Sequence, residues 1–200
     1  VSGTPSSLLP LEMGECVYQM GDDAKMLRTL TDPAIVSQKH MPPSWDVPSL
    51  LEAVAAHEPH AHALIDTGAL ITGYSNFQVA KALLAYGLAW CEGVVFLDDN
   101  DRRMVVFRGG GAAVPLARVG VPWHRRFTFY DQVHSTGVDV QQTLSARAAM
   151  TLGKDMTFRD FAQARAPPRR RALFYLPCAD TTAFACCATA LSTRPPPPAW

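Results

Sequence analysis

The sequence predicts an α/β fold built on a mostly parallel sheet, because strand-like and helix-like segments alternate along its central part. Residues 93–98, GVVFLD, form a continuous apolar run of β-formers, which is typical of a strand covered on both faces. Residues 77–88, FQVAKALLAYGL, repeat apolar side chains at helical spacing (Val79, Leu83, Leu84). Strands separated by helices and long loops favour parallel pairing.

The elements can be placed in chain order. Residues 1–60 are predicted to be an irregular lead-in with one short helix, which begins at Ser49 and is ended by Pro59. Residues 61–165 are predicted to be the α/β domain, with Ser75 or Asn76 capping its first helix. The remaining expected elements are strands at 62–66, 93–98, 103–107, 126–131 and 146–153, a turn at 98–101, a glycine- and proline-rich loop at 108–122, and a helix at 157–165 capped by Thr157.

The last part of the chain differs in composition from the domain. Residues 165–200 hold five arginines, seven prolines and three of the five cysteines, and they end in STRPPPPAW. No core periodicity continues there, so residues 166–200 are predicted to be a disordered tail, or a sequence foreign to the domain.

Composition excludes some classes of function. The 18 basic and 18 acidic residues give a formal net charge of zero, so no global field attracts the chain to nucleic acid or an anionic membrane. Five cysteines at irregular spacing form neither a disulfide framework nor a zinc pattern. Without a signal segment or a membrane-length apolar run, we expect an intracellular protein of the cytoplasm or nucleus that has no membrane partner. The sequence opens VSGTPSS, without a methionine, which we interpret as a segment of a larger protein.

One loop is a candidate for nucleotide response. In FYDQVHSTGVDV (129–140), a strand ends in Asp131 and continues into Thr136, Gly137 and Asp139. Open α/β folds bind ligands at the carboxyl ends of their strands, and small hydroxyl residues with a glycine suit anions there. The alternative is an ordinary turn relieved by Gly137.

The order of elements after this loop resembles the second RecA-like lobe of superfamily 2 helicases. We place Thr136, Gly137 and Asp139 on that family's TxxxGxD loop, which links ATP state to strand contacts. Gly137 and Asp139 have the motif's spacing, whereas Thr136 adjoins Gly137 instead of standing four positions before it. Gln163 matches the start of the family's QxxGRxxR helix. The second motif then departs from the family pattern, because the chain continues as ARAPPRRR. This resemblance implies a helicase C-terminal-like lobe whose missing first RecA-like lobe would hold ATP and Mg²⁺ in a longer parent. The chain alone would bind no cofactor.

A second resemblance covers about residues 62–164. The phrases LIDTGALITGYSNFQVAKALL, RRFTFYDQVHSTGVDV and MTLGKDM are similar to a family of very large eukaryotic proteins from fungi, oomycetes and other protists catalogued as ubiquitin thioesterases. This implies a parent that is a thiol-dependent deubiquitinase (ubiquitinyl hydrolase), with ubiquitin or ubiquitin conjugates as partners. The chain departs from this family after residue 164.

A thiol hydrolase needs a cysteine activated by a histidine. Within the matched region the only such candidates are Cys91 with His124 or His134. Cys91 lies between a helix and a strand, where a cysteine is usually a small buried hydrophobe, so we expect the nucleophile to lie outside this chain.

Two basic segments are weaker candidates. The segment HEPHAH contains His57, His60 and His62. We interpret it as a solvated linker and not as a metal site, and we expect no metal. WHRRF (123–127) could face a nucleic acid or an acidic partner. The simpler interpretation, which we favour, is a charged segment that leads into a strand. Three functions therefore remain: a ubiquitinyl hydrolase segment, a lobe of an ATP-driven motor, or a degenerate lobe that acts as a scaffold.

Overall fold

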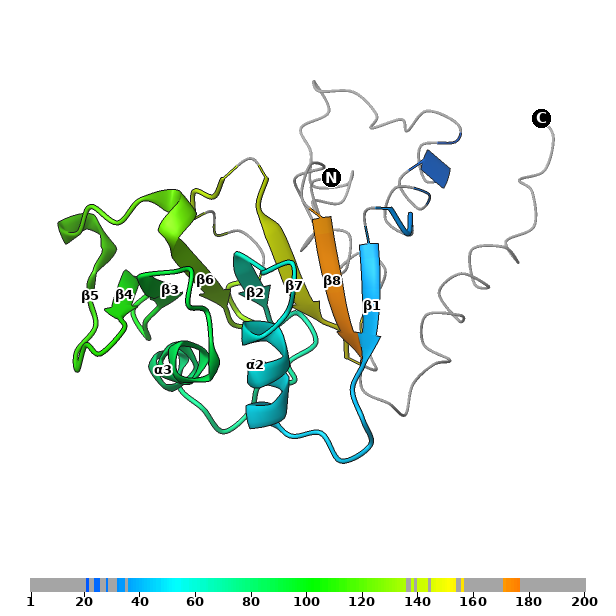
Figure 1. The fold of residues 1–200 in the computed structure, drawn as a ribbon, viewed down its shortest axis with the longest axis horizontal. Helices are drawn as coiled ribbons and strands as arrows, with labels where there is room; N and C mark the ends of the chain where they lie inside the picture. The colour runs from blue at the N-terminus through cyan, green and yellow to red at the C-terminus, as the bar shows by residue number, and fades with distance from the viewer. Residues whose placement is uncertain are drawn as a thin grey trace, which may run out of the picture.

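The computed structural model describes most of the predicted domain. It covers residues 36–135 without a break, the short runs and single residues 21, 24, 25, 28, 32–34, 138, 140–143, 145–153 and 156, and the backbone of Arg171–Leu176. These residues build one sheet, with helices packed on one of its faces (Figure 1). Within them, no helix has both the length and the apolar character needed to cross a membrane.

The sheet is mostly parallel and carries helices on one face, which confirms the predicted α/β class. Its eight strands follow the order β1 (Val36–His40), β8 (Arg171–Leu176), β7 (Arg147–Thr151), β2 (Ala63–Ile65), β6 (Arg126–Tyr130), β3 (Gly93–Leu97), β4 (Arg103–Phe107) and β5 (Val114–Pro115). In this spatial order, every neighbouring pair from β1 through β8, β7, β2 and β6 to β3 is parallel. The last two strands are added antiparallel, β4 on β3 and β5 on β4.

The central strands are buried on both faces, as their apolar sequences predict. In β3, Val94 and Phe96 pack into one hydrophobic cluster, while Val95 and Leu97 pack into the other. We call the first side of the sheet the helix face, because the two helices cover it. The second side is the loop face, where irregular segments contribute the partly buried side chains packed on the sheet, among them Leu116, Val119, Val138 and Met156.

Helix α2 (Val47–Ala55) begins two residues before its predicted start. Asp46 is its N-cap and forms a capping box with Ser49: the Ser49 N–H donates to the Asp46 carboxylate, and the Asp46 N–H donates to the Ser49 hydroxyl. Pro48 lies in the first turn of this helix, where a backbone N–H has no intrahelical partner, so a proline is tolerated there.

Helix α3 (Asn76–Tyr86) follows its prediction closely. Of the two proposed caps, Ser75 is the N-cap, and it forms a capping box with Gln78. Asn76 is the first helical residue, and its side-chain amide donates to the Leu97 carbonyl at the end of β3. Helices α2 and α3 pack against each other and together cover the helix face.

The structure differs from the sequence prediction in three segments. The predicted loop 108–122 contains the short strand β5 and a 3-10 helix, η3 (Leu116–Arg118). Residues 36–40, within the predicted irregular lead-in, form the edge strand β1. The predicted disordered tail contains β8, which pairs with β1 on one side and β7 on the other. The tail prediction weighed overall composition, whereas RALFYL is a local apolar run that can pair on both sides. The predicted helix 157–165 lies outside the described residues.

Candidate functional site

The carboxyl ends of β2 and β6 define the candidate site. These strands are neighbours, and their next residues are Asp66 and Asp131; the Asp66 N–H donates to the Tyr130 carbonyl at 2.8 Å. The chain leaving β2 enters α3 on the helix face, whereas the chain leaving β6 packs Val138 and Val140 on the loop face. Adjacent strands whose connections leave over opposite faces mark a topological switch point, where open α/β sheets bind ligands.

Asp66 organises the loop that follows β2. Its side chain is buried, with 2% exposure, and accepts hydrogen bonds from the N–H groups of Leu70 (2.9 Å) and Ile71 (3.0 Å). The Thr151 hydroxyl at the end of β7 donates to the same carboxylate at 2.5 Å. Thr151 in turn accepts from the Gly68 N–H at 3.0 Å. Asp66 therefore ties its own loop to the end of a strand 85 residues later.

Two glycines let the loops after β2 and β7 touch. A Cβ atom on Gly68 would lie 2.4 Å from the backbone nitrogen of Gly153, and one on Gly153 would lie 2.6 Å from the Gly68 carbonyl oxygen. Real Cβ contacts essentially never become this short. The carboxyl edge of the sheet is thus closed tightly between these two strands, with no side chain at either position.

In the loop after β6, the ring of one histidine lies between the carboxylates of two aspartates. His134 Nδ1 lies 2.5 Å from Asp131 Oδ1, and His134 Nε2 lies 2.8 Å from Asp101 Oδ1. Burial alone would lower the pKa of His134, but the hydrogen bonds and charges of Asp101 and Asp131 outweigh it and raise that pKa. The protonated ring donates to both carboxylates and joins this loop to the β3–β4 turn.

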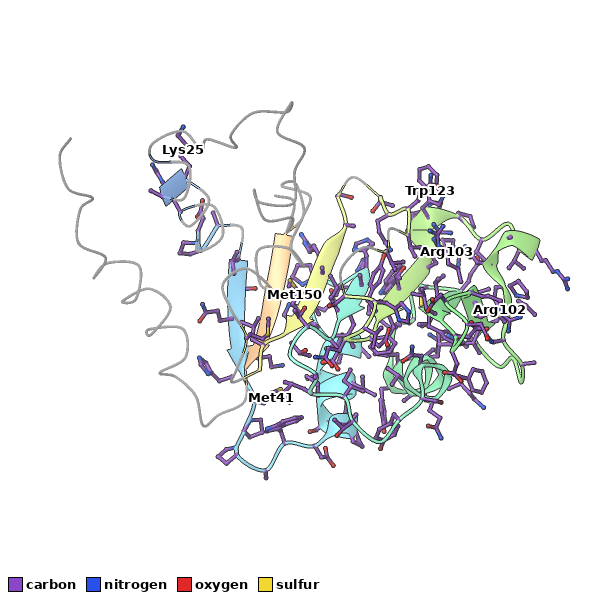
Figure 2. All side chains as sticks on the ribbon, turned by 180° about the vertical axis from the view of Figure 1, so that it is seen from behind. Lys25, Met41, Arg102, Arg103, Trp123 and Met150 are labelled. Atoms are coloured by element: carbon purple, nitrogen blue, oxygen red, sulfur yellow. The ribbon has the colours of Figure 1, made fainter. Side chains whose placement is uncertain are left out.

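The β3–β4 turn is itself held rigidly by Asp98. Its carboxylate accepts from the N–H groups of Asn100 (3.0 Å) and Arg102 (2.9 Å) and pairs with the Arg102 guanidinium. These bonds lower the pKa of Asp98, with the Arg102 side chain the main cause. Figure 2 shows Arg102 and Arg103 at the end of the molecule formed by β3, β4 and β5, far from Met41. Asp101, whose φ is +58°, is thereby presented to His134.

The structure tests the predicted coupling loop only at its start. Its amide groups at His134 and Ser135 donate to the carbonyls of Asp131 and Gln132, so residues 131–135 form a turn. Those two N–H groups are used within the loop, as the simpler turn interpretation expects. Thr136, Gly137, Asp139 and Gln163, the residues matched to the helicase motifs, lie outside the described residues.

The predicted thiol candidates do not come together. Cys91 is 3% exposed in the helix-face core, and burial raises its pKa to about 11. Neither His124 nor His134 is hydrogen-bonded to Cys91 in the part of the chain that the structure describes; His134 is bound to two aspartates instead. A thiol in this position lacks both the thiolate character and the access that a nucleophile needs.

The three histidines of HEPHAH are less solvated than their sequence suggests. The rings of His60 and His62 pack on Trp90, with centroids 4.6 Å and 5.1 Å away. Burial, together with the charges of His60 and Arg147, lowers the pKa of His62 to about 4. Among the described residues no group of three or more metal-ligating side chains is arranged to hold an ion, these histidines included.

Sequence reasoning missed Asp66, Asp101 and Thr151. Asp66 could have been found, because it is an acid that directly follows a buried strand and precedes a glycine-containing loop, as Asp131 does. Asp101 and Thr151 carry no such signal, since each matters through a partner distant in the sequence.

Comparisons with protein-family models, with curated proteins and with solved structures find no match to this chain.

Proposed function

We propose that this chain is a RecA-like coupling lobe of an ATP-driven motor, in which residues 131–140 form the loop that responds to nucleotide. The observation that carries the proposal is the switch point between Asp66 and Asp131, because the segment matched to the TxxxGxD motif begins there. The Thr67 hydroxyl supports it. It is buried beside Asp66 and has no hydrogen-bond partner in the described part of the chain, and a buried polar group without a partner is often completed by a ligand.

The described residues fit a coupling role better than a catalytic one. His134 connects the start of the loop to the β3–β4 turn, so a movement of the loop would be transmitted to that turn. ATP hydrolysis also needs a phosphate-binding loop and a metal-binding acid. In this proposal another lobe supplies both with ATP and Mg²⁺, and this chain alone is inactive.

The experiment measures ATP hydrolysis by the longest natural protein that contains this chain, with and without the substitution Asp131→Ala. Removing the clasp at the start of the loop is expected to lower kcat about tenfold, the effect of roughly 1.4 kcal/mol in the transition state. Asp99→Ala, an exposed change in the β3–β4 turn, is the control. A protein that neither binds nor hydrolyses ATP would contradict the motor function. A degenerate lobe that acts as a scaffold would then be the better account.

A second candidate is a segment of a thiol-dependent deubiquitinase whose nucleophile lies elsewhere in a longer protein. The resemblance of RRFTFYDQVHSTGVDV and MTLGKDM to the ubiquitin thioesterase family supports it. The buried, high-pKa Cys91 agrees with a nucleophile outside this chain. The test is a ubiquitin probe that reacts with active-site thiols: the longer protein should be labelled equally with Cys91 or Cys91→Ala. Loss of labelling in the variant would place the nucleophile at Cys91.

A further inference from the structure

An arginine is buried on the loop face, and none of the described acidic residues forms an ion pair with it. Arg126, the first residue of β6, is 6% exposed, and burial lowers its pKa. Its Nη2 donates to the Gln141 carbonyl at 2.7 Å, but no described residue offers its Nε an acceptor. No ion pair of Arg126 is present among the described residues. The preceding residue, Arg125, instead pairs with Glu92 at the surface, at 3.0 Å. A buried guanidinium without a counter-ion is costly.

Residues 140–143 form a strap that covers this arginine. The Val140 N–H donates to the Tyr130 hydroxyl at 3.2 Å, and Gln142 Nε2 donates to the Thr128 hydroxyl at 2.5 Å. Thr128 and Arg126 are two residues apart on β6, so both side chains point to the loop face. The strap therefore runs along β6 and places the Gln142 amide beside the Arg126 side chain.

The strap leaves polar atoms unpaired as well. Among the described residues, the buried Gln142 Oε1 has no donor and the buried Thr143 hydroxyl has no partner. Together with Arg126 Nε, three of the five buried side-chain atoms without partners in the described residues belong to this one cluster. The neighbour of Thr128 on β2 is Ala63, whose small side chain covers little of the sheet surface beside Thr128. Unpaired buried groups of this kind mark places where a ligand supplies the missing partners.

We propose that Arg126 and Gln142 form a binding site for a carboxylate that carries a neighbouring N–H, such as the C-terminal residue of a peptide. The carboxylate accepts from the Arg126 guanidinium, and the N–H donates to Gln142 Oε1. One ligand thus satisfies both an unpaired donor and an unpaired acceptor. Binding displaces the Gln141 carbonyl from Arg126, while Gln142 stays bonded to Thr128. The site lies toward the amino end of β6, away from the carboxyl edge, and is independent of the proposed function.

The test follows thermal unfolding of the chain with three probes: N-acetylglycine, acetate and N-acetylglycinamide. N-acetylglycine should raise Tm in a saturable manner, because a ligand that binds only the folded state stabilises it. Acetate lacks the N–H and is expected to bind about tenfold more weakly, and uncharged N-acetylglycinamide should have no effect. No response to N-acetylglycine, or an equal response to uncharged N-acetylglycinamide, would overturn the proposal.

Two variants assign the contacts. Arg126→Met should abolish the response and leave the Tm of the free protein unchanged or higher, because it removes an unpaired buried charge. Gln142→Leu should reduce N-acetylglycine to the affinity of acetate, and it carries the test should Arg126→Met not fold. Arg125→Met, which breaks only the surface pair with Glu92, is the matched control. An unchanged response in both site variants would refute the assignment.

Discussion

The Nε2 atom of His134 lies 2.8 Å from the Oδ1 atom of Asp101, a residue 33 positions earlier in the chain. On its other side the same ring bonds Asp131. One half-buried imidazole therefore connects the loop after β6 to the β3–β4 turn, and its charge state decides how strongly.

The first prediction is a pH dependence of stability that arises from His134. Its pKa in the folded state is raised above the ordinary value of 6.5, so its contribution is fully present below pH 6.5 and is lost as pH rises through the folded-state pKa. His134→Gln removes the charge at every pH. The free energy of unfolding of the wild type should thus exceed that of the variant most at about pH 5–6, by on the order of 1 kcal/mol since Asp101 is exposed. The difference should shrink as pH rises through the raised pKa of His134.

Urea unfolding at several pH values measures this difference. The β3–β4 turn also carries the charges of Asp98 and Arg102. These two side chains pair with each other and do not titrate between pH 5 and 8. His124→Gln, at an exposed position on the 3-10 helix η4 (Trp123–Arg125), is the control. If the stability difference between wild type and His134→Gln grew with rising pH, it would contradict the role assigned to the hydrogen bonds of His134 with Asp101 and Asp131.

The second prediction concerns the buried carboxylate of Asp66. Asp66→Asn keeps the size of the side chain but replaces one acceptor oxygen with a donor, which then faces an N–H group or the Thr151 hydroxyl. We expect unfolding free energy to fall by roughly 2–3 kcal/mol, the usual effect of breaking buried hydrogen bonds to a charged group. Asp99→Asn, at an exposed position, should change it by less than about 0.5 kcal/mol. Equal stability of the two variants would contradict the role assigned to Asp66.

The third prediction uses the contact between Gly68 and Gly153. Gly68→Ala places a Cβ 2.4 Å from backbone, which cannot move away as a flexible side chain could. The expected loss is about 1–3 kcal/mol, the range for overpacking a filled space. Gly111→Ala is the matched control, because nothing lies within 4 Å of its added Cβ. Thermal unfolding of both variants decides whether the two loops meet as closely as described.

Local patterns predict the elements of this fold better than they predict its site. The run at 93–98 and the capped helix at α3 are found from neighbouring residues alone, because burial on both faces and capping leave signals within a few positions. Asp66 depends on Thr151, and His134 depends on Asp101, and these partners meet only once the strand order is known. A single sequence does not contain that order. Strand β8 was missed for a different reason, because the composition of residues 166–200 outweighed the local apolar run RALFYL.

The last prediction is that Cys91 is inert in the folded protein. With a pKa of about 11, only about one thiol in a thousand is ionised at pH 8, and the side chain is 3% exposed. Alkylation by iodoacetamide should therefore be at least about a hundredfold slower in buffer than in urea, where the thiol regains an ordinary pKa near 8.5. Mass spectrometry of the peptide that contains Cys91 follows this residue separately from the other four cysteines. Because Cys91 contributes only a small apolar volume to the helix-face core, Cys91→Ala should cost about 1 kcal/mol of stability. Rapid alkylation of the folded chain would show that Cys91 is accessible and reactive, and would reopen its role as a nucleophile.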